Sequence, residues 1–111
     1  MIELVIKKYL DGHLSVSSFL ERPETVPDSY VLFEKTGSSK SNYLPASTFA
    51  FKSYAPSMYE AAVLNEEVKE AVEGMIVLDE ISKISLNSDY NFTDTTTKEY
   101  RYQAVFDINH Y

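Results

Sequence analysis

The alternation of side chains between residues 100 and 111 constrains the fold of this chain more than any other feature. Large or apolar side chains alternate there with mostly polar ones, and a period of two is typical of a β-strand. At about 3.3 Å per residue this strand would be roughly 35–40 Å long, which is more than one small core needs, so we expect it also to serve a neighbouring subunit. One face would carry Tyr100, Tyr102, Ala104, Phe106, Ile108 and His110, and the other Arg101, Gln103, Asp107 and Asn109, with Val105 as the exception.

The composition favours one domain with a modest core, because the chain has 111 residues of which 44% are hydrophobic. The absence of cysteine excludes disulfides, thiolate metal sites and thiol nucleophiles, and it favours an intracellular folding compartment. No basic segment leads into a long apolar run, and no 18 apolar residues follow one another. We therefore expect neither a secretory signal nor a membrane partner.

The charge balance disfavours a conventional nucleic-acid-binding protein. Ten basic residues stand against 17 acidic ones, which gives a net charge of -7 and a surface that repels phosphate. Such a surface would suit a wall past which nucleic acid moves without binding. The chain is also rich in aromatic residues (14%, with nine tyrosines), and tyrosine suits surfaces that become interfaces.

Two helices are predicted. Apolar residues at helical spacing predict one over residues 2–11, with Gly12 as a left-handed C-terminal cap. The second begins after Ser57, where Glu60 completes a capping box, and it ends near Gly74. Its inward, apolar stripe would be Ala61, Leu64, Val68, Ala71, Val72 and Met75. Its solvent-exposed face would carry Glu66, Glu67, Lys69, Glu70 and Glu73.

The remaining segments predict strands and loops. A short alternating segment (14–20) and a proline-containing loop (21–27) precede a strand over Tyr30–Lys35, which a small polar loop from Thr36 to Asn42, expected to be mobile, would end. Further strands are predicted at 47–54, from Ile81, and at the end of the chain, with Asn87–Lys98 as a long turn or an extended hairpin arm. The order predicts an α+β fold in which a single, mostly antiparallel (mixed) sheet of about five strands packs against two α-helices.

The sequence gives little support to catalysis. His13 and His110 lie near opposite ends of the chain, and we interpret them as turn and edge-strand residues. The serines and Lys40 of segment 38–41 lack the second glycine of a phosphate-binding loop, so we interpret the segment as a flexible loop. The alternative is a segment that orders only when a partner arrives. Glu66, Glu70 and Glu73 share a helix stripe interrupted by Lys69, as solvated faces do. We expect no catalytic residues, no metal and no cofactor.

The tyrosines point instead to assembly. Seven of them, at positions 43, 54, 59, 90, 100, 102 and 111, are too many for a core of this size to enclose. Several should therefore lie on a surface that another chain covers.

Two passages resemble a known family. They are residues 49–72, which contain the phrase Ser53-Tyr-Ala-Pro-Ser-Met-Tyr-Glu-Ala61, and the closing passage 100–108, which begins Tyr-Arg-Tyr. Both are similar to the small tail-terminator (minor capsid or minor tail) proteins of siphophages and their prophage relatives. The order of helices and strands agrees with that family over most of the chain. The shared motifs are structural and contain no catalytic signature.

The resemblance implies a role in the virion. Such proteins form a hexameric ring on the last ring of the tail tube, stop tail growth and present the surface that joins the head, while DNA passes through without specific binding. The expected partners are further copies of the chain, the tube protein and a head-completion or connector protein, with assembly in the bacterial cytoplasm. Candidate contact residues are Gly37, Ser38, Ser39, Lys40, Ser41, Asn42, Tyr90, Phe92 and Arg101.

Two alternatives stay open. One is a head-completion or connector protein of the same phage. The other is a small ligand-binding or regulatory α+β domain of the host, which should have an enclosed pocket with converging polar groups. An enzyme ranks third.

Overall fold

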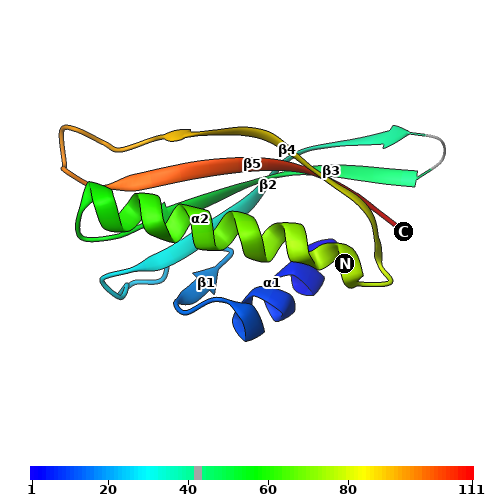
Figure 1. Ribbon diagram of the computed structural model, residues 1–111, viewed down its shortest axis with the longest axis horizontal. Coiled ribbons are helices and arrows are strands. Elements are labelled where there is room, and N and C mark those ends of the chain that lie inside the picture. Colours follow the sequence, from blue (N-terminus) through cyan, green and yellow to red (C-terminus); the bar gives the residue numbers. More distant parts are fainter. Residues whose placement is uncertain (42–43) are drawn as a thin grey trace.

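The computed structural model describes residues 1–41 and 44–111, and these form a mixed sheet with two helices packed on one of its faces (Figure 1). The predicted α+β fold is confirmed. The elements are α1 (Ile2–His13), β1 (Ser17–Phe19), β2 (Tyr30–Ser41), β3 (Leu44–Tyr54), α2 (Met58–Gly74), the 3-10 turn η1 (Met75–Val77), β4 (Ile81–Asn91) and β5 (Arg101–His110).

The five strands lie in the order β1-β2-β3-β5-β4. The short β1 pairs parallel to β2, and the other neighbours pair antiparallel. The alternating strand β5 is therefore interior, with β3 on one side and β4 on the other. Its position explains why its pattern is so regular, since one face is covered by the helices of its own subunit.

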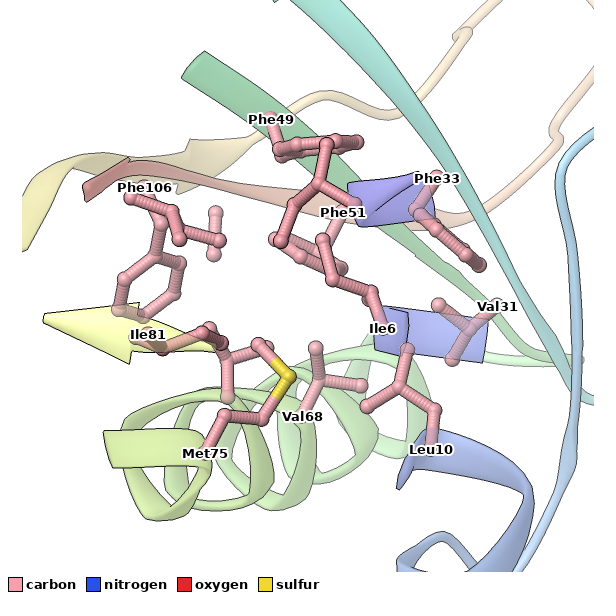
Figure 2. Packing of buried hydrophobic residues seen from close by; sticks show 14 of the residues in the cluster. Ile6, Leu10, Val31, Phe33, Phe49, Phe51, Val68, Met75, Ile81 and Phe106 are labelled. Carbon is pink, nitrogen blue, oxygen red and sulfur yellow. The ribbon is translucent and has the colours of Figure 1, made fainter. Parts of the chain in front are cut away.

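The core lies between this sheet and the helices, as Figure 2 shows. Ala104, Phe106 and Ile108 of β5 are fully buried on the predicted inward face. They meet phenylalanines of β2 and β3 and apolar residues of the helices, namely Phe33, Phe49, Phe51, Ile6, Leu10, Val68, Val72 and Met75. Gln103, on the opposite face of β5, is also buried, which the alternation alone does not predict.

Helix α2 begins as its capping signal predicts. Ser57 is the N-cap, its hydroxyl oxygen accepts the backbone N–H of Glu60 at 3.2 Å, and the hydroxyl donates to the Glu60 carboxylate at 3.0 Å. The predicted inner stripe is buried except for the partly exposed Ala71, and Asn65 joins it.

The predicted left-handed glycine caps are wrong, because no glycine among the described residues has a positive φ. Helix α1 runs through Gly12 to His13. The rings of His13 and Tyr9 stack with 3.8 Å between their centres, and this contact stabilises the last turn of the helix. Gly74 is right-handed and leads into η1. A Cβ at Gly74 would lie 2.9 Å from the Tyr9 hydroxyl oxygen, so glycine serves a close approach there.

The predicted loop from Thr36 is also wrong, because β2 continues to Ser41 and pairs with β3 from Leu44 onward. A bulge between Lys35 and Gly37 lets the ladder continue past the core. Polar residues form strand here because β3 satisfies their backbone groups, although no core pattern marks them. Asn42 lies outside the described residues.

Pro45 fits this longer hairpin. The pairing of β3 with β5 begins at Ala46, so at Pro45 the only paired neighbour of β3 is β2. A proline is tolerated where one side of a strand has no ladder partner.

The sequence leaves open whether Asn87–Lys98 is a long turn or an extended hairpin arm, and the β4–β5 hairpin shows that it is an arm. Strand β4 runs to Asn91, and a bridge between Asp94 and Glu99 closes the turn. In Figure 1 this arm and the β2–β3 arm point to opposite ends of a molecule that is 43 Å along its longest axis.

Candidate functional site

The structure brings together three of the predicted contact residues, Tyr90, Phe92 and Arg101, at the β4–β5 end of the sheet. The rings of Tyr90 and Phe92 meet edge to face at 5.7 Å. The Arg101 guanidinium lies 4.7 Å from the centre of the Phe92 ring, and its Nε donates to the Phe92 carbonyl at 2.8 Å. The arm is thus fixed to β5 by an arginine that uses both its plane and its N–H groups.

The stack continues onto two buried tyrosines. Arg101 also lies 5.7 Å from the ring of Tyr54, which stacks on Tyr30 at 4.6 Å. Arg22, from the segment after β1, lies 5.3 Å from the Tyr54 ring and 5.9 Å from that of Tyr30. We call Arg22, Tyr30, Tyr54, Phe92 and Arg101 the aromatic–arginine cluster.

One carboxylate joins the two arginines of this cluster. Glu99 accepts from Arg22 at 2.7 Å through one oxygen and from Arg101 at 3.1 Å through the other. Arg22 also donates to the Tyr30 hydroxyl at 2.6 Å. Glu99 therefore ties the segment after β1 to the base of the β4–β5 arm.

The pKa values of two members of the cluster, Arg22 and Tyr30, are raised. The hydrogen bond to Tyr30, followed by that to Glu99, raises the pKa of Arg22 further above its already high value. Burial raises the pKa of Tyr30, against the opposing effect of Arg22. Near neutral pH, Arg22 is therefore a cation held against the neutral ring of Tyr30.

A shallow hollow of about 200 Å³ lies beside the cluster, between Pro27, Pro56 and Lys98. Pockets for drug-sized ligands measure roughly 300–1,000 Å³, so this volume suits a side chain better than a whole ligand.

The amide of Gln103 underlies the arm. Its Nε2 donates to the Tyr90 hydroxyl, and its buried Oε1 has no hydrogen-bond partner among the residues that the structure describes. Tyr90 thus satisfies a buried donor as well as presenting a ring, which gives it a structural role that Phe92 lacks.

The other predicted contact residues lie elsewhere. Gly37 and Ser38 are exposed on the β2–β3 arm, which points away from the β4–β5 arm (Figure 1). Ser39, Lys40 and Ser41 continue the same strand. The structure therefore divides the predicted contacts into two separate surfaces.

Of the five residues of the aromatic–arginine cluster, the sequence predicts only Phe92 and Arg101 as site residues. It singles out neither Arg22 nor Tyr30, nor the Glu99 that joins the two arginines, and it marks Tyr54 only as one of many tyrosines. Arg22 and Glu99 are 77 positions apart, and no local pattern connects them. Only the register that pairs Tyr30 with Tyr54 and Tyr54 with Arg101 brings these groups together.

The two histidines are not the turn and edge-strand residues that the sequence predicts, because His13 is the last residue of α1 and His110 belongs to β5, which lies between β3 and β4. The Nδ1 of His13 lies 2.8 Å from the Tyr9 carbonyl, and the Nε2 of His110 lies 3.0 Å from the Ser47 hydroxyl. In residues 1–41 and 44–111 no group of three or more histidine and acidic side chains is arranged to hold a metal ion. No helix in the same ranges is long and apolar enough to cross a membrane.

Comparison with protein-family models gives no match for this chain. Comparison with curated proteins gives none either. The function is therefore argued from the residues and surfaces above.

Proposed function

We propose that this chain is a structural protein of a phage or prophage virion that caps the tail tube as an oligomeric ring. In this role it ends tail elongation and provides the surface to which the head is joined. The observation that carries the proposal is the pair of hairpin arms at opposite ends of one small domain, one of them bearing the aromatic–arginine cluster (Figure 1). A subunit that touches neighbours on more than one side needs contact surfaces that are spatially separate.

The passage that resembles tail terminators supports the proposal through its placement. Within residues 53–61, Tyr54 ends β3 and stacks in the aromatic–arginine cluster, and Ser57 caps α2. Tyr59, two positions further, is largely exposed on the helix. The passage therefore builds the junction of strand and helix and also leaves an aromatic side chain free for a partner.

The charge of the chain is compatible with a ring around DNA. Each subunit carries a net charge of -7, so a hexamer would place acidic surface around the DNA. DNA would pass without specific binding. In this proposal the partners are further copies of the chain, the tube protein and a head-completion or connector protein, and the site of action is the head-proximal end of the virion tail after assembly in the host cytoplasm.

Tube assembly in the presence of the protein tests the proposal. Tail-tube protein of a siphophage would be polymerised with and without this chain, and tube lengths would be measured by electron microscopy. A terminator should shorten the tubes in proportion to its amount and appear as a density at one end. Tubes of unchanged length and bare ends would refute the proposal, and binding to connector protein alone would favour the head-completion alternative.

A further inference from the structure

One end of the molecule carries an open apolar groove. It lies beside the N-terminal half of α1 and has a volume of about 440 Å³. Its walls are Met1, Leu4, Val5, Lys8, Leu78 and Glu80. Leu4 is 59% exposed and the adjacent Val77 is 76% exposed, so large apolar side chains surround the groove without being covered.

The opposite end carries an apolar ridge. Tyr59 and Val63 lie one turn apart on the outer face of α2, where they are 78% and 51% exposed. In Figure 1 the start of α2 and the start of α1 are at opposite ends of the helical layer. The groove and the ridge therefore lie apart in one subunit, so the ridge cannot fill the groove of its own subunit.

Charged side chains lie beside both surfaces. Lys8 and Glu80 both line the groove, and Lys8 has no ion pair within residues 1–41 and 44–111, where the other cation of this turn, Lys7, is paired with Asp11. Glu60 and Glu66 are exposed beside the ridge, and Glu66 is paired with Lys69 of its own helix. A ridge set in a groove would bring Glu60 toward the unpaired Lys8.

We propose that the groove binds the Tyr59–Val63 ridge of a second copy of this chain, so that subunits associate head to tail. A convex ridge fits a concave groove, whereas a groove against a groove would leave the hollow empty. Contacts between two different surfaces form a closed ring or an open filament, but not a two-fold dimer. The closure into a ring rests on the proposed function, while the head-to-tail contact can be tested by itself.

Disulfide trapping tests this contact, because the natural chain has no cysteine. Four single variants would be made: Leu4→Cys and Val77→Cys for the groove, and Tyr59→Cys and Val63→Cys for the ridge. All four positions are more than half exposed. Thermal melts would verify that the variants fold. Leu86→Cys, at a 47% exposed position on β4 that belongs to neither the groove nor the ridge, is the matched control. Equimolar pairs would be oxidised with diamide and dimers quantified on non-reducing gels.

Mixed groove and ridge variants should cross-link at least tenfold faster than either does alone or with the control. A double variant with Leu4→Cys and Val63→Cys should give ladders of higher oligomers. Faster groove–groove or ridge–ridge cross-linking would overturn the proposal in favour of a symmetric dimer, and equal rates for all pairs would overturn it outright. Neither result depends on tube protein, so failure here is distinct from failure of the tube-capping proposal.

Discussion

Glu99 concentrates the interactions of the aromatic–arginine cluster in one side chain. It binds both arginines, but all three side chains are partly exposed, so solvent screens much of the attraction. Glu99→Gln should therefore lower the free energy of unfolding by only about 1 kcal/mol in urea titrations. It should also loosen the segment around Arg22, which hydrogen exchange would detect as faster exchange after β1.

The matched control is Glu73→Gln on the exposed face of α2, where the described residues supply no ion-pair partner. If the two variants lose the same stability, the link between Arg22 and Arg101 through Glu99 contributes nothing specific.

Two helical glycines should respond oppositely to alanine. Around Gly12 nothing lies within 4 Å of an added Cβ, so Gly12→Ala should stabilise the protein by about 0.5–1 kcal/mol through helix propensity. At Gly74 the added Cβ would meet the Tyr9 hydroxyl at 2.9 Å, and the Tyr9 ring is held against His13. Gly74→Ala should lower the free energy of unfolding, as measured by urea titration.

The variant Tyr9→Phe separates the steric clash at Gly74 from the gain in helix propensity, since it removes the hydroxyl that the added Cβ would contact. In that background Gly74→Ala should become neutral or stabilising. A loss of stability that persists without the hydroxyl would contradict the role given to the close approach.

Among the elements, the β4–β5 arm is expected to matter for assembly more than for folding. The double variant of Tyr90→Ala and Phe92→Ala should leave the subunit folded but weaken self-association or tube binding, because both rings are partly exposed. Circular dichroism and sedimentation would measure the two outcomes.

The single variants sharpen this prediction. Tyr90→Ala removes the partner of the buried Gln103 amide and should itself cost about 1–3 kcal/mol of stability, whereas Phe92→Ala should cost less. An unfolded double variant would show that these side chains belong to the core and would remove them from the interface.

The turn of the same arm should depend on pH. The backbone N–H groups of Thr97 and then Thr96 hydrogen bond to the Asp94 carboxylate and hold its pKa below the ordinary 3.8. Because the folded-state pKa is the lower one, this stabilisation is complete above pH 3.8 and is lost as pH falls through the folded-state value. The stability gap between the natural chain and Asp94→Asn should therefore shrink in acid, as thermal melts across pH would measure.

Elements with a local signal could be predicted from the sequence, and those formed by pairing could not. The capping box at Ser57 and Glu60 predicts α2, and the alternation of residues 100–111 predicts β5. The outer half of β2 carries no apolar side chain, so nothing in Thr36–Ser41 distinguishes strand from loop until β3 lies beside it. The aromatic–arginine cluster could not be predicted either, because Tyr30 and Tyr54 come together only when β2 pairs with β3.

At the scale of the whole molecule, the proposed contact surfaces lie far apart. One end combines the β4–β5 arm with the start of α2, and the β2–β3 arm forms the other end (Figure 1). The groove is lined by the first residues of α1, which lie at the end of the helical layer away from the start of α2. This polarity gives each subunit two different ends, which a ring with neighbours on both sides requires. No single helix or strand could provide it.

The net charge of -7 sets how this assembly should respond to salt. Copies repel one another over about 30 Å at 0.01 M salt but only over about 8 Å at 0.15 M. The groove and ridge are mainly apolar, so little attraction is lost to screening, while the repulsion between whole subunits falls. Self-association, measured by sedimentation velocity, should therefore strengthen several-fold between these salt concentrations. Association that weakens with salt would mean that ion pairs dominate the contact, and would move the interface away from the apolar groove toward the charged residues of the arms.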